Sequence, residues 1–200
     1  MDMTLYAVIG LMAVSFITPG PNNFIILNVA AKSGPVAALP LVLVIILGWL
    51  SLFGSAWFGV SRVLLETPFL NRALLLAGSA YLGFHSINLL FRDNGRYDQR
   101  PEKSPFVETA AGLALFQFLN PKGWVLAVTV AASVPNDGAL ALLLALTAAW
   151  ISAASLLAWS VAGASLKVWL KGRRSRRAFD VVMGLSLAGF CVSIVVHQWP

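Results

Sequence analysis

Thr18-Pro19-Gly20-Pro21-Asn22-Asn23 and Asn120-Pro121-Lys122-Gly123 interrupt two long apolar stretches of the sequence. Proline lacks a backbone N–H and clashes with the preceding helical turn, and an adjacent glycine leaves helical dihedral angles easily. A single proline would favour a plain kink, but two interruptions with polar neighbours favour breaks that expose backbone groups to a cavity. We therefore predict that both helices are broken. The residues expected to form the breaks are Pro19, Gly20, Pro21, Pro121 and Gly123.

The composition of the chain predicts a membrane protein. Of its 200 residues, 58% are hydrophobic and only 11% are charged, whereas about 25% of the residues in globular domains are charged. Such a chain is too apolar to be soluble or disordered. Apolar runs near 20 residues, the length that crosses a bilayer as a helix, predict an all-α integral membrane protein with six transmembrane helices in one domain, residues 1–200. The spans are expected at about 5–31, 36–60, 69–91, 109–134, 138–166 and 178–196.

The basic residues predict the orientation in the membrane. The net charge is +6, from 14 lysines and arginines against 8 acids. With six spans, 11 of the 14 fall on one face, Arg62 and Arg72 fall on the other, and Lys122 falls on neither. The positive-inside rule makes the first face cytoplasmic, which puts both termini in the periplasm of a bacterial inner membrane. The excess charge therefore indicates topology rather than nucleic-acid binding. The cytoplasmic residues are Lys32, Arg92, Arg96, Arg100, Lys103, Lys167, Lys171, Arg173, Arg174, Arg176 and Arg177.

The two halves of the chain, about 1–100 and 101–200, match each other at an offset near 102 residues. The matches occur in all three spans of each half, which a bias toward alanine and leucine would not produce so consistently. Because each half has an odd number of spans, the halves enter the membrane from opposite faces. The sequence therefore predicts a 3+3 inverted-topology repeat with broken helices 1 and 4, an architecture that places a substrate site near mid-membrane. Matching pairs include Phe16-Ile17-Thr18-Pro19 with Phe118-Leu119-Asn120-Pro121, Trp49-Leu50-Ser51 with Trp150-Ile151-Ser152, and Gly83-Phe84 with Gly189-Phe190.

Lys122 is the most informative charge of the chain. It lies roughly 18 Å from either end of its predicted span, at 1.5 Å per helical residue, and a lysine stem reaches only about 6 Å. It therefore needs a cavity, and no acidic residue is predicted at its depth. Three states are considered for its ammonium: contact with backbone carbonyls of the break, contact with a substrate carboxylate, or loss of the proton. A purely structural tether is the alternative to a functional role.

Polar side chains at the breaks are further candidates for a substrate site. Asn22 and Asn23 are expected to cap the second half of the first broken helix, whose positive end suits a carboxylate. Thr18 and Asn120 lie in the breaks themselves. Together with Lys122, these four residues are predicted to bind the substrate.

Two tryptophans and a histidine are weaker candidates. Trp49 and Trp150 occupy matching mid-span positions and are predicted to line the pathway, with packing against lipid or other helices as the alternative. His85 lies in the apolar third span and is considered as a proton relay beside Lys122, although packing explains a lone histidine as well.

Three motifs stand in the first, third and fourth spans: Thr18-Pro19-Gly20-Pro21-Asn22, Tyr81-Leu82-Gly83 and Asn120-Pro121-Lys122. In these motifs, and over essentially its whole length, the chain resembles the lysine exporter and homoserine/threonine resistance (LysE/RhtB) translocators. The resemblance implies a bacterial inner-membrane exporter of amino acids driven by the proton motive force. The expected partners are an amino acid, protons and membrane lipids. A homodimer is left open, and no cofactor, metal or nucleic acid is expected.

The residues and the resemblance together favour alternating access, in which two halves rock about a central cavity that holds the substrate carboxylate. The absence of an acid at mid-membrane favours neutral or hydrophobic amino acids over dibasic ones. A metal-ion exporter would need a cluster of ligands inside the membrane, where only His85 and Cys191 are found. An enzyme is not expected, because no set of nucleophile, base and orienting acid is evident. A non-transporting scaffold is the other alternative, and it would have a filled centre around Lys122.

Overall fold

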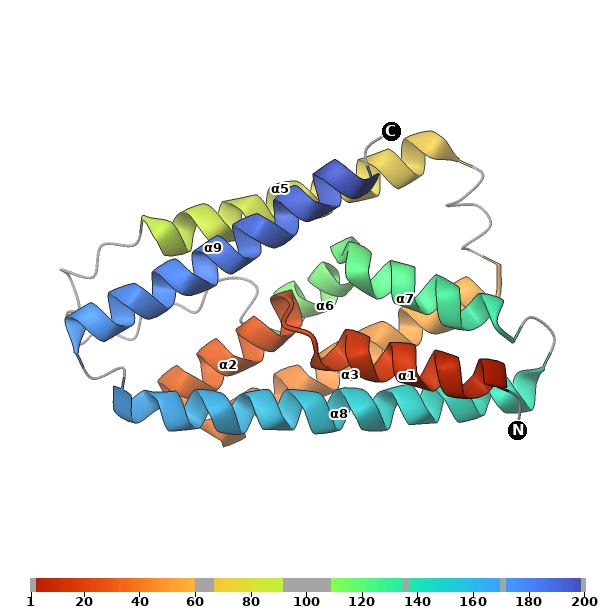
Figure 1. Ribbon diagram of the computed structural model, residues 1–200, viewed down its shortest axis with the longest axis horizontal. Helices are drawn as coiled ribbons and strands as arrows, with labels where there is room; N and C mark the ends of the chain where they lie inside the picture. The colour runs from red at the N-terminus through yellow and green to blue at the C-terminus, as the bar shows by residue number, and fades with distance from the viewer. Residues whose placement is uncertain (1–2, 60–66, 92–108, 135–136, 170–171, 199–200) are drawn as a thin grey trace.

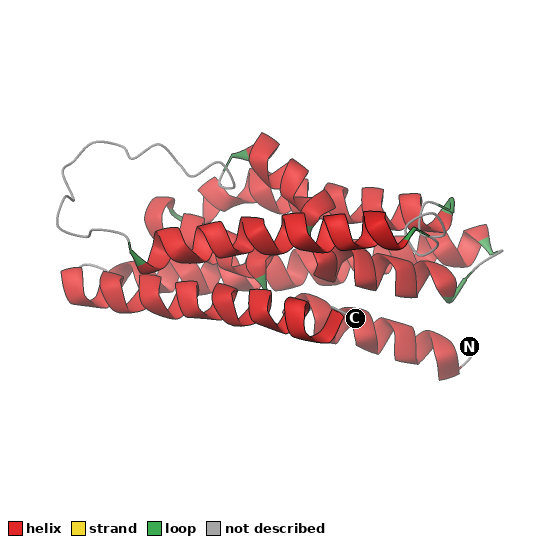
Figure 2. Ribbon diagram, turned by 90° about the horizontal axis from the view of Figure 1, so that it is seen from above, coloured by secondary structure: helices red, strands yellow, loops and turns green. Residues whose placement is uncertain are grey.

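The computed structural model describes residues 3–59, 67–91, 109–134, 137–169 and 172–198. Within these residues the chain forms eight α-helices and no strand (Figure 1 and Figure 2), so the predicted all-helical class is confirmed. The segments 61–66, 92–108, 135–136 and 170–171, which lie between the predicted spans, are outside the described residues, and the orientation in the membrane stays a prediction. The helices are α1 (Met3–Ile17), α2 (Pro21–Ser33), α3 (Pro35–Trp57), α5 (Pro68–Leu90), α6 (Ala110–Leu119), α7 (Pro121–Ala132), α8 (Gly138–Trp169) and α9 (Arg173–Gln198).

Proline begins α2, α3, α5 and α7. The first turn of a helix does not use its N–H groups internally, so proline is tolerated there and its fixed φ favours the helical start. Gly34, with φ 93°, ends α2 and leads directly into Pro35 of α3. Only glycine adopts this backbone conformation without strain. The tight connection between α2 and α3 therefore follows from the pair Gly34-Pro35.

Four of the predicted spans are long and apolar enough to cross a membrane. Pro35–Trp57 and Gly138–Leu166 meet this criterion as single helices. Leu5–Ile17 with Pro21–Ser33, and Ala110–Leu119 with Pro121–Ala132, meet it when each bent pair counts as one span. These segments correspond to the first, second, fourth and fifth predicted spans.

The two remaining predicted spans lie in α5 and α9. Helix α9 begins at Arg173, five residues earlier than the predicted start, and α8 continues to Trp169 rather than ending at 166. Both ends of the segment between the fifth and sixth predicted spans, residues 167–177, are therefore helical. Arginine is a good helix former, so the arginines from Arg173 onward belong to α9 although they lie outside the predicted apolar span.

The two broken helices pack against the continuous helices of the opposite half of the chain. Helices α1 and α2 lie along α8, and α6 and α7 lie along α3, while α3 and α8 also contact each other. Helices α5 and α9 pair side by side along one edge of the bundle (Figure 1). Helix α8 comes close to α2 at Gly163, where a Cβ would overlap the backbone of Leu27.

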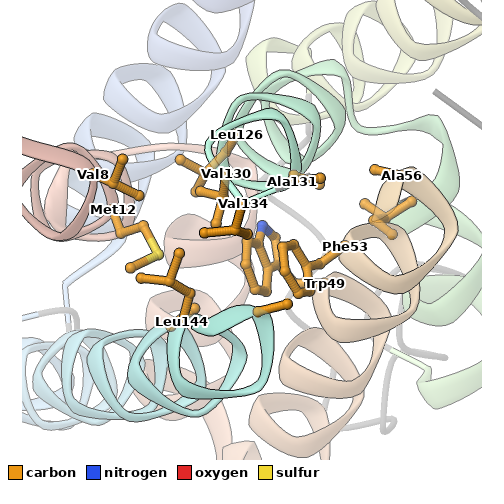
Figure 3. Packing of buried hydrophobic residues seen from close by; sticks show 14 residues of the cluster. Val8, Met12, Trp49, Phe53, Ala56, Leu126, Val130, Ala131, Val134 and Leu144 are labelled. Atoms are coloured by element: carbon orange, nitrogen blue, oxygen red, sulfur yellow. The ribbon is translucent and has the colours of Figure 1, made fainter. Parts of the chain in front are cut away.

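Buried apolar side chains form two clusters. The first joins α1, α3, α7 and α8, and Figure 3 shows Met12, Trp49, Leu126 and Leu144 pointing toward one another from these four helices. The second joins α2, α3, α6 and α8. Its members include Ile26, Ile45, Phe116 and Leu156. The two clusters hold the broken helices against α3 and α8 on both sides of the breaks.

Large apolar side chains are also exposed on the outer faces of the helices. Val36, Leu43, Phe58 and Val161 are examples, all with more than half of their surface accessible. Soluble monomers rarely expose apolar patches of this extent. The outer surface is therefore suited to hydrocarbon rather than water.

Candidate functional site

A cavity of about 50 Å³ lies where the two helix breaks meet. Its wall takes residues from both apolar clusters, so it separates them. Polar side chains from α2, α6, α7 and α8 converge on it. The lining residues are Ser15, Phe16, Gly20, Pro21, Asn22, Asn23, Ile45, Trp49, Gln117, Asn120, Lys122, Gly123, Leu126, Ser152 and Leu156.

The first break falls between Ile17 and Pro21, as predicted, and bends the span by 44°. Gly20 is extended there, with φ −160° and ψ 177°. In a continuous helix the carbonyls of Phe16 and Thr18 would accept hydrogen bonds from the N–H groups of Gly20 and Asn22. The break interrupts this pattern, so the two carbonyls need other partners. Asn23 Nδ2 donates to both, at 3.1 Å and 3.0 Å, and Ser155 Oγ donates to the Phe16 carbonyl at 2.9 Å. The first break is thus held by side chains of α2 and α8.

The predicted capping role of Asn22 and Asn23 is wrong. Gly20 is the N-cap of α2, and no side chain caps this end. Both asparagines lie inside the first turn, because Pro21 already starts the helix. Asn23 reaches back to the carbonyls of α1, and Asn22 binds across the bundle to α6.

Asn22 and Gln117 form a reciprocal amide pair between α2 and α6. Asn22 Nδ2 donates to Gln117 Oε1 at 2.9 Å, and Gln117 Nε2 donates to Asn22 Oδ1 at 3.1 Å. Gln117 is 2% exposed, and Gly48 of α3 packs against it so closely that a Cβ there would overlap its side chain. The sequence interpretation missed Gln117. The available signal was a single amide inside the apolar run Ala110–Leu119.

The second break, also as predicted, bends the fourth span by 61° and contains only Asn120. Asn120 ends α6 and begins α7, but its side chain makes no capping hydrogen bond. Trp124 Nε1 donates to the carbonyl of Phe118 at 2.9 Å. Gly123, predicted to form part of the break, instead lies inside α7, where a Cβ would stand 3.0 Å from Leu52 of α3. Its small size therefore serves helix packing.

Lys122 connects the two breaks. Its Nζ donates to the carbonyl of Thr18 at 3.1 Å, across 104 residues of sequence. A Cβ at Gly20 would stand 3.2 Å from this Nζ, so glycine leaves the space that the ammonium occupies. No aspartate or glutamate stands among the described residues that line the cavity. Of the two partners considered for the Lys122 ammonium, the backbone carbonyl of the break is the one in contact here.

Three buried polar atoms of the cavity wall have no hydrogen-bond partner. They are Trp49 Nε1, Asn120 Oδ1 and Ser152 Oγ. The ring of Trp49 is fixed by stacking on Phe53, with centroids 5.5 Å apart, and by an edge contact with Phe16 at 5.4 Å. Ser152 was not singled out from the sequence, where it lies in a long apolar run of α8.

Two of the predicted site residues do not contribute a side chain to the cavity. Trp150 is 77% exposed on the outer surface of α8, so the prediction that it lines the pathway with Trp49 is wrong. Thr18 does not line the cavity: its carbonyl accepts hydrogen bonds from Asn23 and Lys122, and its exposed Oγ1 donates to the carbonyl of Val14 at 2.6 Å. His85 lies in α5, and its side chain is outside the described part of the structure.

Two broken helices that meet at a lysine in a polar cavity are found here in a chain with an apolar outer surface. The sequence profile of one family, described as LysE type translocator, matches residues 13–198. The chain belongs to the LysE type translocator family. The match spans both breaks and every residue that lines the cavity, and it confirms the resemblance found in the sequence. No solved structure matches the chain significantly.

Membership of the LysE type translocator family, together with the apolar helices, makes this a membrane protein. The family also indicates the export of amino acids or related compounds. In the described part of this LysE type translocator, the cavity at the two breaks is the candidate functional site, because polar side chains of both halves and Lys122 line it.

Proposed function

We propose that this LysE type translocator is a secondary-active, proton-coupled exporter of neutral or hydrophobic amino acids in the bacterial inner membrane. It works by alternating access around the cavity at the two breaks. The observation that carries this proposal is Lys122, whose ammonium contacts a backbone carbonyl beside a cavity with no acid among its described lining residues. The carboxylate of an amino acid supplies the counter-charge that the Lys122 ammonium lacks, whereas a second cation on the substrate would find no counter-charge in the cavity.

The proposed architecture is six spans arranged as a 3+3 inverted repeat, with both termini in the periplasm. The exchange of packing partners between the halves supports it. Helices α1 and α2 lie on α8 of the second half, while α6 and α7 lie on α3 of the first half. Exchanging the halves converts one of these two sets of contacts into the other, as a two-fold relation in the membrane plane requires, whereas the contact of α2 with α3 has no counterpart of similar extent between α7 and α8. The basic residues assigned to one face support the orientation.

The proposed substrate contact replaces an internal one. In this conformation Lys122 is bound to the Thr18 carbonyl of the other half. A substrate carboxylate competes for the same ammonium and forms the stronger, charge-assisted hydrogen bond. Asn22 and Asn23 line the cavity from the first turn of α2, where backbone N–H groups have no acceptor within the helix and the dipole favours an anion. Binding therefore loosens the link between the breaks while it neutralises Lys122.

The cavity volume supports movement of the halves. At about 50 Å³ the cavity is small beside the roughly 300–1,000 Å³ of pockets that hold drug-sized ligands. An amino acid enters only when the walls separate. The walls belong to helices of both halves, so rocking of one half against the other widens the site and opens it toward one face at a time.

Replacement of Lys122 tests the proposal. Vesicles reconstituted with the protein are loaded with a mixture of neutral amino acids, and efflux is followed under a pH gradient and again after the gradient is collapsed. We expect gradient-driven efflux from the wild type, none from Lys122→Met, and wild-type efflux from Lys32→Met, which removes an exposed cation from the last turn of α2. Wild-type rates from folded Lys122→Met would overturn the assignment of Lys122, and efflux that ignores the gradient would overturn proton coupling.

A further inference from the structure

The unpartnered atoms of the cavity wall differ from ordinary buried polar groups. Trp49 and Asn120 are 4% exposed and Ser152 is 2% exposed, and each has a polar atom without a hydrogen-bond partner. Buried polar groups in folded proteins are nearly always paired, because an unpaired group loses its hydration without compensation. The three residues that carry these atoms, from α3, the second break and α8, all line one cavity, which indicates a site whose partner is a bound molecule.

The chemistry of the three atoms restricts that molecule. Trp49 Nε1 can only donate, Asn120 Oδ1 can only accept, and the hydroxyl of Ser152 can do either. Lys122 adds a cationic donor to the same cavity. A ligand that satisfies all four must therefore carry an acceptor with negative charge and also a donor. The carboxylate and the ammonium of a zwitterion meet both requirements in one small molecule.

The remaining wall restricts the rest of the ligand. Phe16, Ile45, Leu126 and Leu156 supply apolar surface, and the ring of Trp49 is held between Phe16 and Phe53. An apolar substituent on the zwitterion packs against these side chains, whereas a charged one would be desolvated without a partner.

We propose that Trp49, Asn120 and Ser152 form the recognition site for the zwitterionic head of an aliphatic α-amino acid. Trp49 Nε1 binds the carboxylate beside Lys122. Asn120 Oδ1 and Ser152 Oγ accept hydrogen bonds from the ammonium, which needs neutral acceptors because the described residues of the lining include no acid. The inference rests on the proposed export of amino acids, and it adds that the protein reads both charged ends of its substrate and rejects molecules that lack either one.

The duplicated sequence supplies matched control residues. Trp49-Leu50-Ser51 of α3 matches Trp150-Ile151-Ser152 of α8. Trp150 is exposed, and Ser51 is exposed with its Oγ donating to the carbonyl of Leu47 at 2.8 Å. The variants Trp49→Phe and Ser152→Ala can thus be compared with Trp150→Phe and Ser51→Ala, which make the same chemical change outside the cavity.

The experiment measures half-saturating concentrations for export. Alanine, valine, leucine and methionine are tested first in reconstituted vesicles. The best exported of these is then compared with its N-acetyl derivative, its amide and its 2-hydroxy acid analogue as competitors. We expect the wild type to be inhibited by the amino acid and not by the three analogues. Trp49→Phe, Ser152→Ala and Asn120→Leu should weaken binding of the amino acid by about 10- to 100-fold, while the two control variants match the wild type.

The preference between analogues separates recognition from a structural effect. In Ser152→Ala and Asn120→Leu the advantage of the amino acid over its 2-hydroxy acid should shrink toward unity, because the ammonium has lost its acceptors. In Trp49→Phe the advantage over the amide should shrink instead. If the wild type exports none of the four amino acids, the proposed function fails. If it exports them and the variants keep wild-type affinities or wild-type preferences, the recognition site is wrong while the exporter stands.

Discussion

The two helix breaks differ in what they leave unsatisfied. The first break extends over residues 18–20, and side chains from α2, α7 and α8 bind the carbonyls that it exposes. The second contains only Asn120, and a side-chain oxygen of this residue stays without a partner although it is buried. The comparison indicates that the two breaks have different roles. The first break fixes the geometry of the cavity, and the second supplies a polar oxygen that has no partner, Asn120 Oδ1.

The length of the break explains the difference. Residues 18–20 separate α1 from α2, so the carbonyls of Phe16 and Thr18 lose the N–H groups four residues ahead that a continuous helix would supply, and they need donors from elsewhere. In the second break only Asn120 separates α6 from α7, and the chain resumes its helix at Pro121. Lys122 then follows directly and reaches across to the first break. The longer break therefore leaves carbonyls that bind the donors of neighbouring helices.

Asn23→Leu should produce the largest loss of stability. It removes two hydrogen bonds from a residue that is 6% exposed, one to each carbonyl of the first break, and we expect a loss of about 2 kcal/mol. Thermal unfolding in detergent measures the change, and Asn23→Asp checks that the missing donor is responsible. Asn120→Leu at the second break should leave the unfolding temperature unchanged. Equal destabilisation of Asn23→Leu and Asn120→Leu would contradict the comparison.

The amide pair between Asn22 and Gln117 ties the first half to the helix that leads into the second break. Because the two bonds are reciprocal, the double replacement by leucine should cost less than the sum of the single replacements, with a coupling free energy of about 1 kcal/mol. A double-mutant cycle on the unfolding free energy gives this value. Strict additivity would mean that the pair does not connect the breaks energetically.

The smallest expected change in stability comes from replacing either of two serines of α8. Ser155 donates to the Phe16 carbonyl of the first break, and Ser152 lines the cavity without a partner. Ser155→Ala should cost about 0.5 kcal/mol, because Asn23 still binds the same carbonyl. Ser152→Ala should cost nothing in stability and should impair export instead. The reverse pattern, with Ser152 stabilising and Ser155 needed for export, would exchange the roles assigned to the two breaks.

The sequence predicted the breaks because proline and glycine act locally. It also singled out Lys122, since a cation inside an apolar segment stands out against its neighbours, and the structure places this residue between the two breaks. Gln117, Ser152 and Ser155 did not stand out, because isolated small or amide side chains are common in membrane helices and their partners lie far away in the chain. Gln117 binds Asn22 across 95 residues, and Ser155 binds Phe16 across 139.

The matched tryptophans show a second limit of sequence reasoning. Trp49 is 4% exposed and Trp150 is 77% exposed, although both begin the same three-residue pattern. A sequence match aligns positions along two helices, but it does not fix the rotation of each helix about its axis. Residues two apart lie nearly on opposite faces of a helix, so α3 presents its tryptophan to the cavity and α8 presents its serine. The duplicated sequence thus builds a cavity with different groups on its two walls.

Helix α8 is long and unbroken, with 32 residues, while the helices packed on it are interrupted. At 1.5 Å per residue it measures about 48 Å, well beyond the roughly 30 Å of a bilayer's hydrocarbon core. A rod of this length must tilt or enter the headgroup region, and a thinner membrane increases the tilt. Because α1 and α2 lie along α8, a change in the tilt of α8 should also move the first break. The rate of export should therefore vary with the acyl-chain length of the lipids.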